Sequence, residues 1–176
     1  MGTTAAEERD HVDRFLETVR QVLPTLDLEV EGLVDRIGGL SRRFHRALDE
    51  TLAEFGLDNV EWKVLSFLTQ AGPPYRSSPG RLAERLELSS GAMTNRLDGL
   101  EEAGLVRRLP DPEDRRGVLV ELTDEGRRLH DAAVGAQAKK EAFVASALSR
   151  REQKQLNALL RRLMLAFERA EQQARR

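Results

Sequence analysis

The chain has 176 residues and a formal net charge of −2 at pH 7, and 40% of its residues are hydrophobic and 33% are charged. This composition excludes intrinsically disordered and collagen-like chains. No apolar run approaches the roughly 18 residues of a membrane helix, and the first residues turn acidic where a signal peptide would be hydrophobic. We therefore expect a soluble, cytoplasmic protein without a membrane partner.

The residue types that carry most enzyme and metal chemistry are scarce. There are no cysteines, which excludes disulfides, thiolate metal sites and catalytic thiols. His11, His45 and His130 lie far apart in the sequence, without the spacing of metal ligands. The nucleophile, zinc and phosphate-loop motifs of common enzymes are also missing. The sequence thus predicts no metal, no cofactor and no enzyme activity.

The charge is unevenly distributed along the chain, because the first third is acidic and the last third is basic. Neither part is a basic tail or patch of the kind that indicates nucleic-acid binding from charge alone. A DNA-binding function must therefore be inferred from the pattern of elements.

The first third of the chain predicts two helices. Apolar residues three and four positions apart predict a helix over residues 6–23, which Pro24 ends. Asp27 is expected to cap a second helix that reaches Glu54 and is roughly 40 Å long. Such a helix cannot bury its apolar stripe within a small domain, so we expect a second chain to cover it.

The middle of the chain predicts three further helices. The first follows Gly56, and the second begins where Ser78 and Pro79 provide an N-cap hydroxyl and a proline at the first helical position. A turn that begins at Ser89 leads into the third helix, which ends at Gly104.

After Gly104 the apolar period changes from 3.6 to 2, which predicts strands over 105–109 and 117–122 with a charged hairpin tip between them. Thr123 is expected to cap a long helix to about Leu148, and Ser149 opens the last helix with a capping box. The last helix carries an apolar stripe.

This order of elements is that of a winged helix-turn-helix. We expect a mainly α fold with a two-stranded β-wing and an α-helical dimerisation region. The predicted division is into N-terminal dimerisation helices (1–57), a DNA-binding module (58–122) and C-terminal dimerisation helices (123–176).

The helix after Ser89 has one face that must be buried and one that is small and polar. Met93, Leu97 and Leu100 fall on the first face. A small polar face can approach base edges in the major groove, although an ordinary solvated helix would show the same pattern. The candidates for contact with DNA on this helix are Ser89, Ser90, Thr94, Asn95 and Arg96.

The hairpin tip favours DNA binding over a solvated face. Arg115 and Arg116 at the end of a two-stranded ribbon suit a narrow, negatively charged minor groove. Asp114 is expected to order the tip by holding a guanidinium rather than to touch DNA. A charged turn alone is more simply a solvated turn, but the helix and the hairpin together are far more specific.

Three segments of the sequence carry a family resemblance. The matching residues are Ser78, Pro79, Leu82, Ala83 and Leu86 in the first; Ser89, Met93, Thr94, Leu97, Asp98, Leu100, Glu101, Gly104, Leu105, Val106 and Arg108 in the second; and Asp111, Pro112, Asp114, Arg115, Arg116, Gly117, Val118, Val120, Leu122 and Thr123 in the third. The sequence resembles the MarR family of bacterial transcriptional regulators over roughly residues 28–176.

The resemblance implies a homodimer, held by its N- and C-terminal helices, that reads a pseudo-palindromic operator in double-stranded DNA. By this resemblance Arg116 would enter the minor groove, while Ser90, Thr94 and Asn95 would meet the major groove and Asp114 would order the wing. It also implies a repressor that releases DNA when a small aromatic or phenolic effector binds between the dimer helices and the winged module.

The chain also resembles the urate-responsive branch of that family. The features that carry this resemblance are an additional N-terminal helix, the turn Gly72-Pro73-Pro74 and the run Thr94-Asn95-Arg96. Arg96 and either Arg107 or Arg108 would occupy the arginine positions of that branch. The sequence departs from the branch at Lys63, where the branch has aspartate, and in its first helix, which has no tryptophan.

The residues that we predict at a ligand site are His45, Trp62, Arg96 and Arg107. Other roles remain open for three of them. His45 could be a partly exposed packed ring and Trp62 a core residue. Arg96 could contact phosphate or form a structural salt bridge with Glu101 or another acid. Overall the sequence predicts a sequence-specific DNA-binding transcriptional regulator. The alternative is a helical adaptor that binds only proteins, which would have no use for a basic wing tip.

Overall fold

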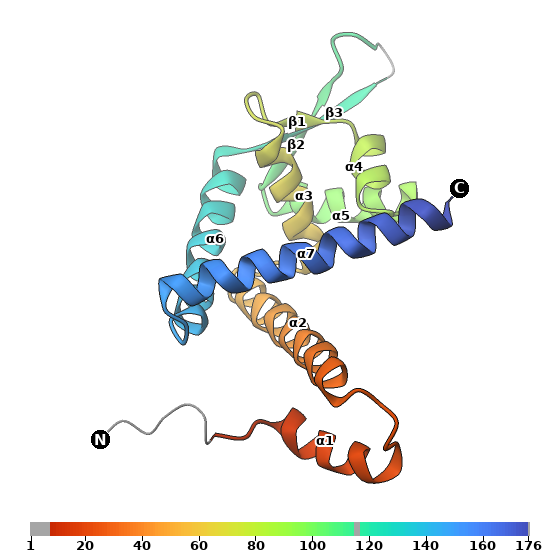
Figure 1. Cartoon of the computed structure of the whole chain (residues 1–176). Helices are drawn as coiled ribbons and strands as arrows, with labels where there is room; N and C mark the ends of the chain where they lie inside the picture. Colours follow the sequence, from red (N-terminus) through yellow and green to blue (C-terminus); the bar gives the residue numbers. More distant parts are fainter. Residues whose placement is uncertain (1–7, 115–116, 176) are drawn as a thin grey trace. The chain divides into compact units, whose positions relative to one another are not determined.

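The structure, a computed structural model, describes residues 8–114 and 117–175 (Figure 1). The helices are α1 (His11–Val22), α2 (Leu28–Glu54), α3 (Asn59–Gln70), α4 (Pro79–Arg85), α5 (Ser90–Glu102), α6 (Asp124–Ala145) and α7 (Arg150–Ala174), and the strands are β1 (Arg76–Ser77), β2 (Val106–Pro110) and β3 (Val118–Leu122). The chain forms two compact units, Met1–Asn59 and Val60–Arg176. The predicted division into three parts stays a prediction.

Helix α1 packs against α2 within the first unit. Asp10 caps α1 and also accepts a hydrogen bond from Nε of Arg36 on α2, at 2.9 Å. The Arg36 guanidinium is the main reason why the pKa of Asp10 is lowered to about 2. Gly32 lets α1 approach closely, because a Cβ at this position would lie 3.1 Å from Cδ1 of Leu16. An ion pair and a close apolar contact therefore hold the two helices together.

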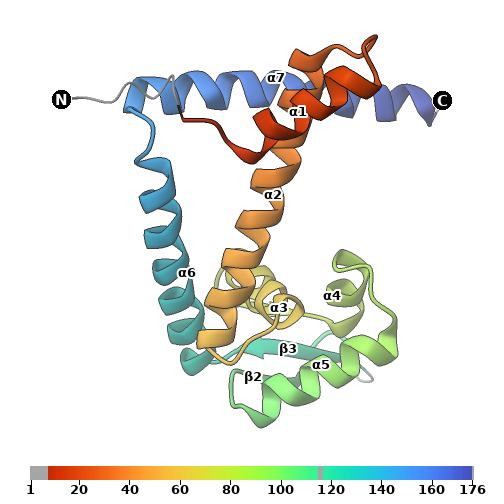
Figure 2. The ribbon, with the colours of Figure 1, turned by 90° about the horizontal axis from the view of Figure 1, so that it is seen from below.

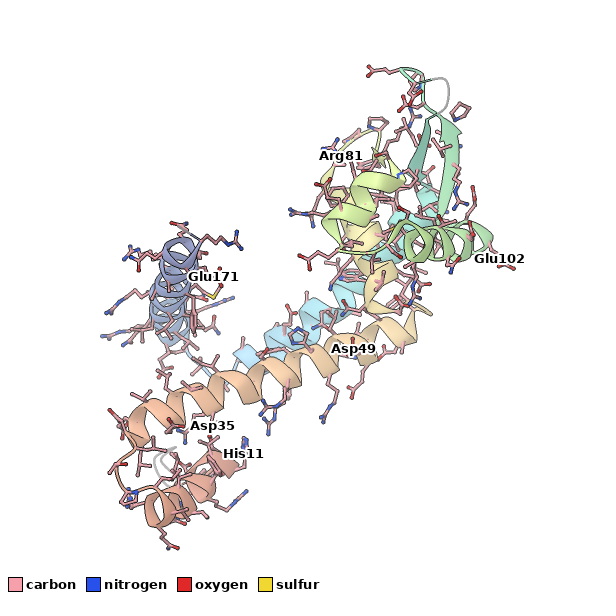
Figure 3. The ribbon with its side chains drawn as sticks, turned by 90° about the vertical axis from the view of Figure 1, so that its right-hand side faces the viewer. His11, Asp35, Asp49, Arg81, Glu102 and Glu171 are labelled. Carbon is pink, nitrogen blue, oxygen red and sulfur yellow. The ribbon has the colours of Figure 1, made fainter. Side chains whose placement is uncertain are left out.

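Much of the apolar surface of the first unit remains exposed. The exposed apolar side chains of α2 are those of Val30, Leu33, Val34, Ile37, Leu40 and Phe44. On α1, Val12 is buried but Phe15 is half exposed. Figure 3 shows His11 on α1 and Asp35 on α2, which line the same small pocket of about 210 Å³.

The second unit is built around a three-stranded antiparallel sheet in the order β1-β3-β2. Strands β2 and β3 form the predicted two-stranded wing, and the short β1 adds a third strand that the sequence analysis did not predict. Arg76 of β1, Glu121 of β3 and Arg107 of β2 lie in register across the sheet. The register thus places one acidic residue, Glu121, between two arginines.

Helices α3, α4 and α5 pack with the sheet to form the core of the second unit (Figure 2). The fully buried side chains here include Val64, Leu65, Leu68, Leu82, Met93, Leu97, Leu100, Val106 and Val120. They occupy one face of each helix, as the apolar period predicts. The opposite face of α5 remains exposed.

The start of α6 is tied to the joint between α5 and β2. The Thr123 hydroxyl accepts a hydrogen bond from the N–H of Gly126, at 3.0 Å, and donates one to the carbonyl of Gly104, at 2.8 Å. A Cβ on Gly126 would lie 2.1 Å from the carbonyl oxygen of Leu105, so only glycine fits there. Gly104 ends α5 with a φ of +71°, a conformation that favours glycine.

Three predicted helix limits differ from the structure. Helix α4 ends at Arg85 rather than near residue 88, because Glu87 has a positive φ of 54° that a helix cannot accommodate. Helix α6 ends at Ala145 rather than near residue 148. Directly after this end, the Ser146 hydroxyl donates a hydrogen bond to the carbonyl of Phe143. Helix α1 begins only after its cap at residue 10; residues 1–7 lie outside the described part.

No helix in the described ranges is long and apolar enough to span a membrane.

Candidate nucleic-acid interface

Helix α5 presents an exposed polar surface whose orientation its buried side fixes. Met93, Leu97 and Leu100 are each 1% exposed and anchor the helix in the core. On the other side, five candidate DNA contacts are exposed: Ser89, Ser90, Thr94, Asn95 and Arg96. The structure therefore leaves these five predicted contacts accessible on one short helix and its cap.

Two hydroxyl groups on α5 already have partners within the helix. The Ser89 hydroxyl caps α5 by accepting a hydrogen bond from the N–H of Ala92, at 3.2 Å, which leaves its own proton available to a phosphate oxygen. The Thr94 hydroxyl donates to the carbonyl of Ser90, at 2.9 Å. Thr94 can thus offer another molecule only an acceptor lone pair and its methyl group.

The β2–β3 hairpin projects from the helices of the second unit (Figure 1). The N–H of Asp111 donates to the carbonyl of Gly117 at 3.0 Å, and the N–H of Gly117 donates to the carbonyl of Asp114 at 2.8 Å. A Cβ on Gly117 would lie 2.9 Å from that of Asp111, so the turn needs glycine there. Asp114 is exposed. Arg115 and Arg116, the predicted minor-groove contacts, lie outside the described residues.

Glu121 is a buried acid held by two arginines on one face of the sheet. Its carboxylate accepts hydrogen bonds from Arg76 and from Arg107, whose Nε lies at 2.7 Å. Burial alone would raise the pKa of Glu121, but the two arginines outweigh that effect and lower it. Arg107, predicted at a ligand site, is therefore bonded to Glu121.

Arg108 connects the wing to α5 from the other face of β2. Its guanidinium donates to Oδ1 of Asp98, at 2.6 Å, and to Glu101. Its backbone N–H also donates to Oε1 of Glu101, at 2.9 Å. Desolvation would lower the pKa of Arg108, but the two acids raise it overall. From the sequence, Arg96 was the candidate partner of Glu101; in the structure Arg108 binds Glu101.

The four predicted ligand residues occupy different surroundings. His45 is exposed on α2, where its Nδ1–H donates to the carbonyl of Ser41 at 2.8 Å. Trp62 lines a pocket of about 290 Å³ that includes neither Arg96 nor Arg107. In that pocket, therefore, Trp62 is not joined by the two arginines that were predicted at the same ligand site.

Trp62 also makes a ring contact that was not predicted from the sequence. The Trp62 ring stacks on the buried ring of His130, with centroids 4.6 Å apart and an angle of 16° between the planes. Nε2 of His130 lies 3.1 Å from the Ser66 hydroxyl. The pocket is lined by Trp62, Lys63, Ser66, Phe67, Gln70, Arg85 and Leu86. No cluster of three or more potential metal-ligating side chains occurs among the described residues.

Comparison with known proteins assigns this arrangement to a family. A model of the MarR family matches residues 55–117. The HTH-type transcriptional regulator PecS of Dickeya dadantii (strain 3937) is 34% identical over 152 residues, which cover 86% of this chain and 92% of PecS. The chain belongs to the MarR family. A shorter match to the multiple antibiotic resistance protein MarR of Escherichia coli (strain K12) is 37% identical over 87 residues, 49% of this chain and 58% of that protein.

Solved structures share the fold. The YusO protein from Bacillus subtilis superposes with a TM-score of 0.71 at 24% identity, covering 81% of this chain and 99% of YusO. A mutant of MarR from E. coli gives 0.64 at 29% identity, covering 75% and 96%. A mutant of MepR from S. aureus bound to an oligodeoxyribonucleotide gives 0.62 at 22% identity, covering 77% and 97%. The predicted winged-helix fold and the predicted class of helix-turn-helix transcriptional regulator are confirmed.

Proposed function

We propose that this MarR-family chain acts as a homodimeric repressor that places α5 in the major groove of its operator and the wing in the adjacent minor groove. The observation that carries the proposal is that α5 exposes a small polar face while its opposite face is anchored in the core beside the wing. Helix α5 and the β2–β3 wing, the two elements with which a winged helix-turn-helix contacts DNA, thus belong to one packed unit.

The chemistry of α5 divides the contacts into two kinds. Asn95 is exposed and carries the amide that pairs with adenine through two hydrogen bonds, and the Thr94 methyl group suits a thymine methyl. The Ser89 and Ser90 hydroxyls and the Arg96 guanidinium are assigned to phosphate oxygens, which position the helix without reading sequence. Arg115 and Arg116 are assigned to the minor groove, with Asp114 ordering them.

The homodimer is proposed because the chain does not cover its own apolar helix faces. None of the 25 residues of α7, all of them described, is buried. The exposed apolar side chains of α7 are those of Leu156, Leu159, Leu163, Met164, Leu165 and Phe167. A second copy would cover these faces, and the two reading helices would then meet half-sites about one helical turn, roughly 34–36 Å, apart.

A small aromatic or phenolic acid is proposed as the effector. Trp62 and Phe67 supply aromatic walls to the Trp62 pocket, and Lys63 and Arg85 supply positive charge. The Arg85 guanidinium carbon lies 5.9 Å from the centroid of the Phe67 ring. A planar anion would match this combination of ring surfaces and cations.

The test is fluorescence anisotropy on DNA from upstream of the protein's own gene, titrated at several salt concentrations. We expect saturable binding that resists competitor DNA, with a log–log salt slope of several units because each neutralised phosphate releases counterions. Asn95→Ala should weaken binding by about 1–3 kcal/mol, whereas Asn157→Ala, the same change on α7, should not. A folded dimer that binds neither this DNA nor fragments selected from the genome would contradict the proposal.

A further inference from the structure

We propose that Arg108 is a positioning residue that sets the angle between α5 and the wing, so that both elements fit one stretch of DNA simultaneously. The inference rests on the proposed function, because the angle has a consequence only if the helix and the wing both bind DNA. It assigns to Arg108 a role that acts through α5 and needs no contact with DNA.

Arg108 acts as a clamp, by which we mean that it is bonded to two successive turns of α5. Asp98 and Glu101 are three positions apart on α5 and therefore lie about one turn apart along one side of the helix. The Arg108 guanidinium binds both carboxylates, and the Arg108 N–H binds Glu101 as well. Contact at two successive turns opposes sliding of α5 along β2 and also rotation about the helix axis.

The adjacent arginine holds the same strand from the opposite face. Successive side chains of a strand alternate between its two faces, so Arg107 and Arg108 diverge. Arg107 pairs with Glu121 of β3, whereas Arg108 pairs with α5. Strand β2 is therefore bonded to the rest of the wing on one face and to the reading helix on the other.

Arg108 also changes the charge that α5 presents. Asp98 follows Thr94 by four positions and Asn95 by three, so it lies on the same exposed side of the helix as these two candidates for base contact. A carboxylate there would repel DNA phosphates. The guanidinium at 2.6 Å neutralises it, and the Arg108 side chain itself is only 29% exposed because it lies against the helix.

The joint between α5 and β2 needs such a clamp because its backbone is short and bends sharply. Only three residues separate Glu102 from Val106, and Gly104 among them has a positive φ. The backbone bonds at this joint, such as that from the N–H of Leu105 to the carbonyl of Leu100 at 2.9 Å, hold the end of the helix. Arg108 adds a second attachment farther along the strand, which determines the direction of the wing.

The experiment compares operator and scrambled DNA for wild type, Arg108→Ala, Glu101→Gln and the control Arg107→Ala. We expect Arg108→Ala to weaken operator binding about 10- to 100-fold with a smaller loss on scrambled DNA, and the salt slope to be unchanged because no phosphate contact is lost. Glu101→Gln should also weaken operator binding, about tenfold, although it removes a negative charge. Arg107→Ala should bind the operator within about threefold of wild type, because it leaves the link to α5 intact.

A direct phosphate contact would give the opposite pattern, which makes the proposal refutable. If Arg108 touched DNA, Arg108→Ala would lower the salt slope by about one per subunit, and Glu101→Gln would leave binding unchanged or tighten it. Either result would overturn the positioning role. Partial recovery in the charge-exchanged double variant Arg108→Glu with Glu101→Arg would support it.

Stability and wild-type binding provide the remaining controls. The variants should melt within about 4 °C of wild type, because the ion pairs are partly exposed; a larger shift that accounts for the loss of binding would overturn the inference. If wild type and Arg107→Ala bind the operator and Arg108→Ala binds equally well, the inference fails alone. If wild type binds no DNA, the proposed function fails and the inference fails with it.

Discussion

Helices α5 and α7 belong to the same unit but differ in how much of their apolar surface the chain itself buries. Helix α5 has 13 residues and buries Met93, Leu97 and Leu100 within its own chain. Helix α7 has 25 residues, each of them within the described range, and buries none. One chain thus suffices to shape the surface that we assign to DNA, whereas the apolar face of α7 stays exposed in one chain and is assigned by our proposal to a second copy.

This difference has a thermodynamic consequence. The packing of α5 contributes to the unfolding free energy of one chain, so its contribution is independent of protein concentration. If a second copy covers α7, the stabilisation that α7 provides is an association free energy and depends on concentration. Substitutions in the two helices should therefore be distinguishable by dilution.

The largest expected effect is on the free energy of unfolding, from a substitution on the buried face of α5. Leu97→Ala leaves a cavity beneath α5 and should lower the unfolding free energy by about 2–5 kcal/mol. The loss should be the same in urea titrations at two protein concentrations, because Leu97 packs within one chain. A loss that disappeared on dilution would show that the α5 core depends on the partner.

The next largest effect is expected on dimer association, from a substitution on the exposed apolar face of α7. Leu159→Glu places a charge in the proposed dimer interface and should weaken association by about 3 kcal/mol, more than a hundredfold in the dimer dissociation constant. Sedimentation velocity should show a folded monomer at concentrations where the wild type is a dimer. Gln172→Glu, which adds a charge on the side of the same helix that lies opposite Leu156, Leu159 and Leu163, is the control. An unchanged sedimentation profile for Leu159→Glu would refute the interface.

A smaller effect should follow from the wing tip. Arg116→Ala should weaken operator binding by about 1–3 kcal/mol and leave the melting temperature nearly unchanged, because the side chain is assigned to DNA. Anisotropy and thermal melting on the same preparation measure both quantities. An equal loss of folding stability would give Arg116 a structural role instead.

The smallest effect should depend on pH. Glu121 has a lowered pKa in the folded chain, so its contribution to stability is complete above its unfolded pKa of about 4.3 and is lost as the pH falls through the lower folded value. Glu121→Gln should therefore cost about 1–2 kcal/mol at pH 7. Denaturant titrations should show the gap to wild type shrinking below about pH 4; a gap that widened in acid would contradict the sign of the pKa shift.

The features that the sequence determined are those that depend on neighbouring residues. Ser78, Thr123 and Ser149 were each predicted to cap a helix, and each hydroxyl accepts a backbone N–H from the first turn of that helix. The buried face of α5 followed from its apolar period in the same way. Caps and periods involve residues a few positions apart, so local stereochemistry decides them.

The partners of the charged and aromatic side chains required the folded chain. Strand β1 is only two residues long and pairs with residues more than 40 positions away, so its own sequence carries too little pattern to predict it. The contacts of Arg108 with α5 and of Trp62 with His130 likewise join different elements. Arginine and tryptophan have several possible partners of similar energy, and tertiary packing selects among them by bringing one within reach.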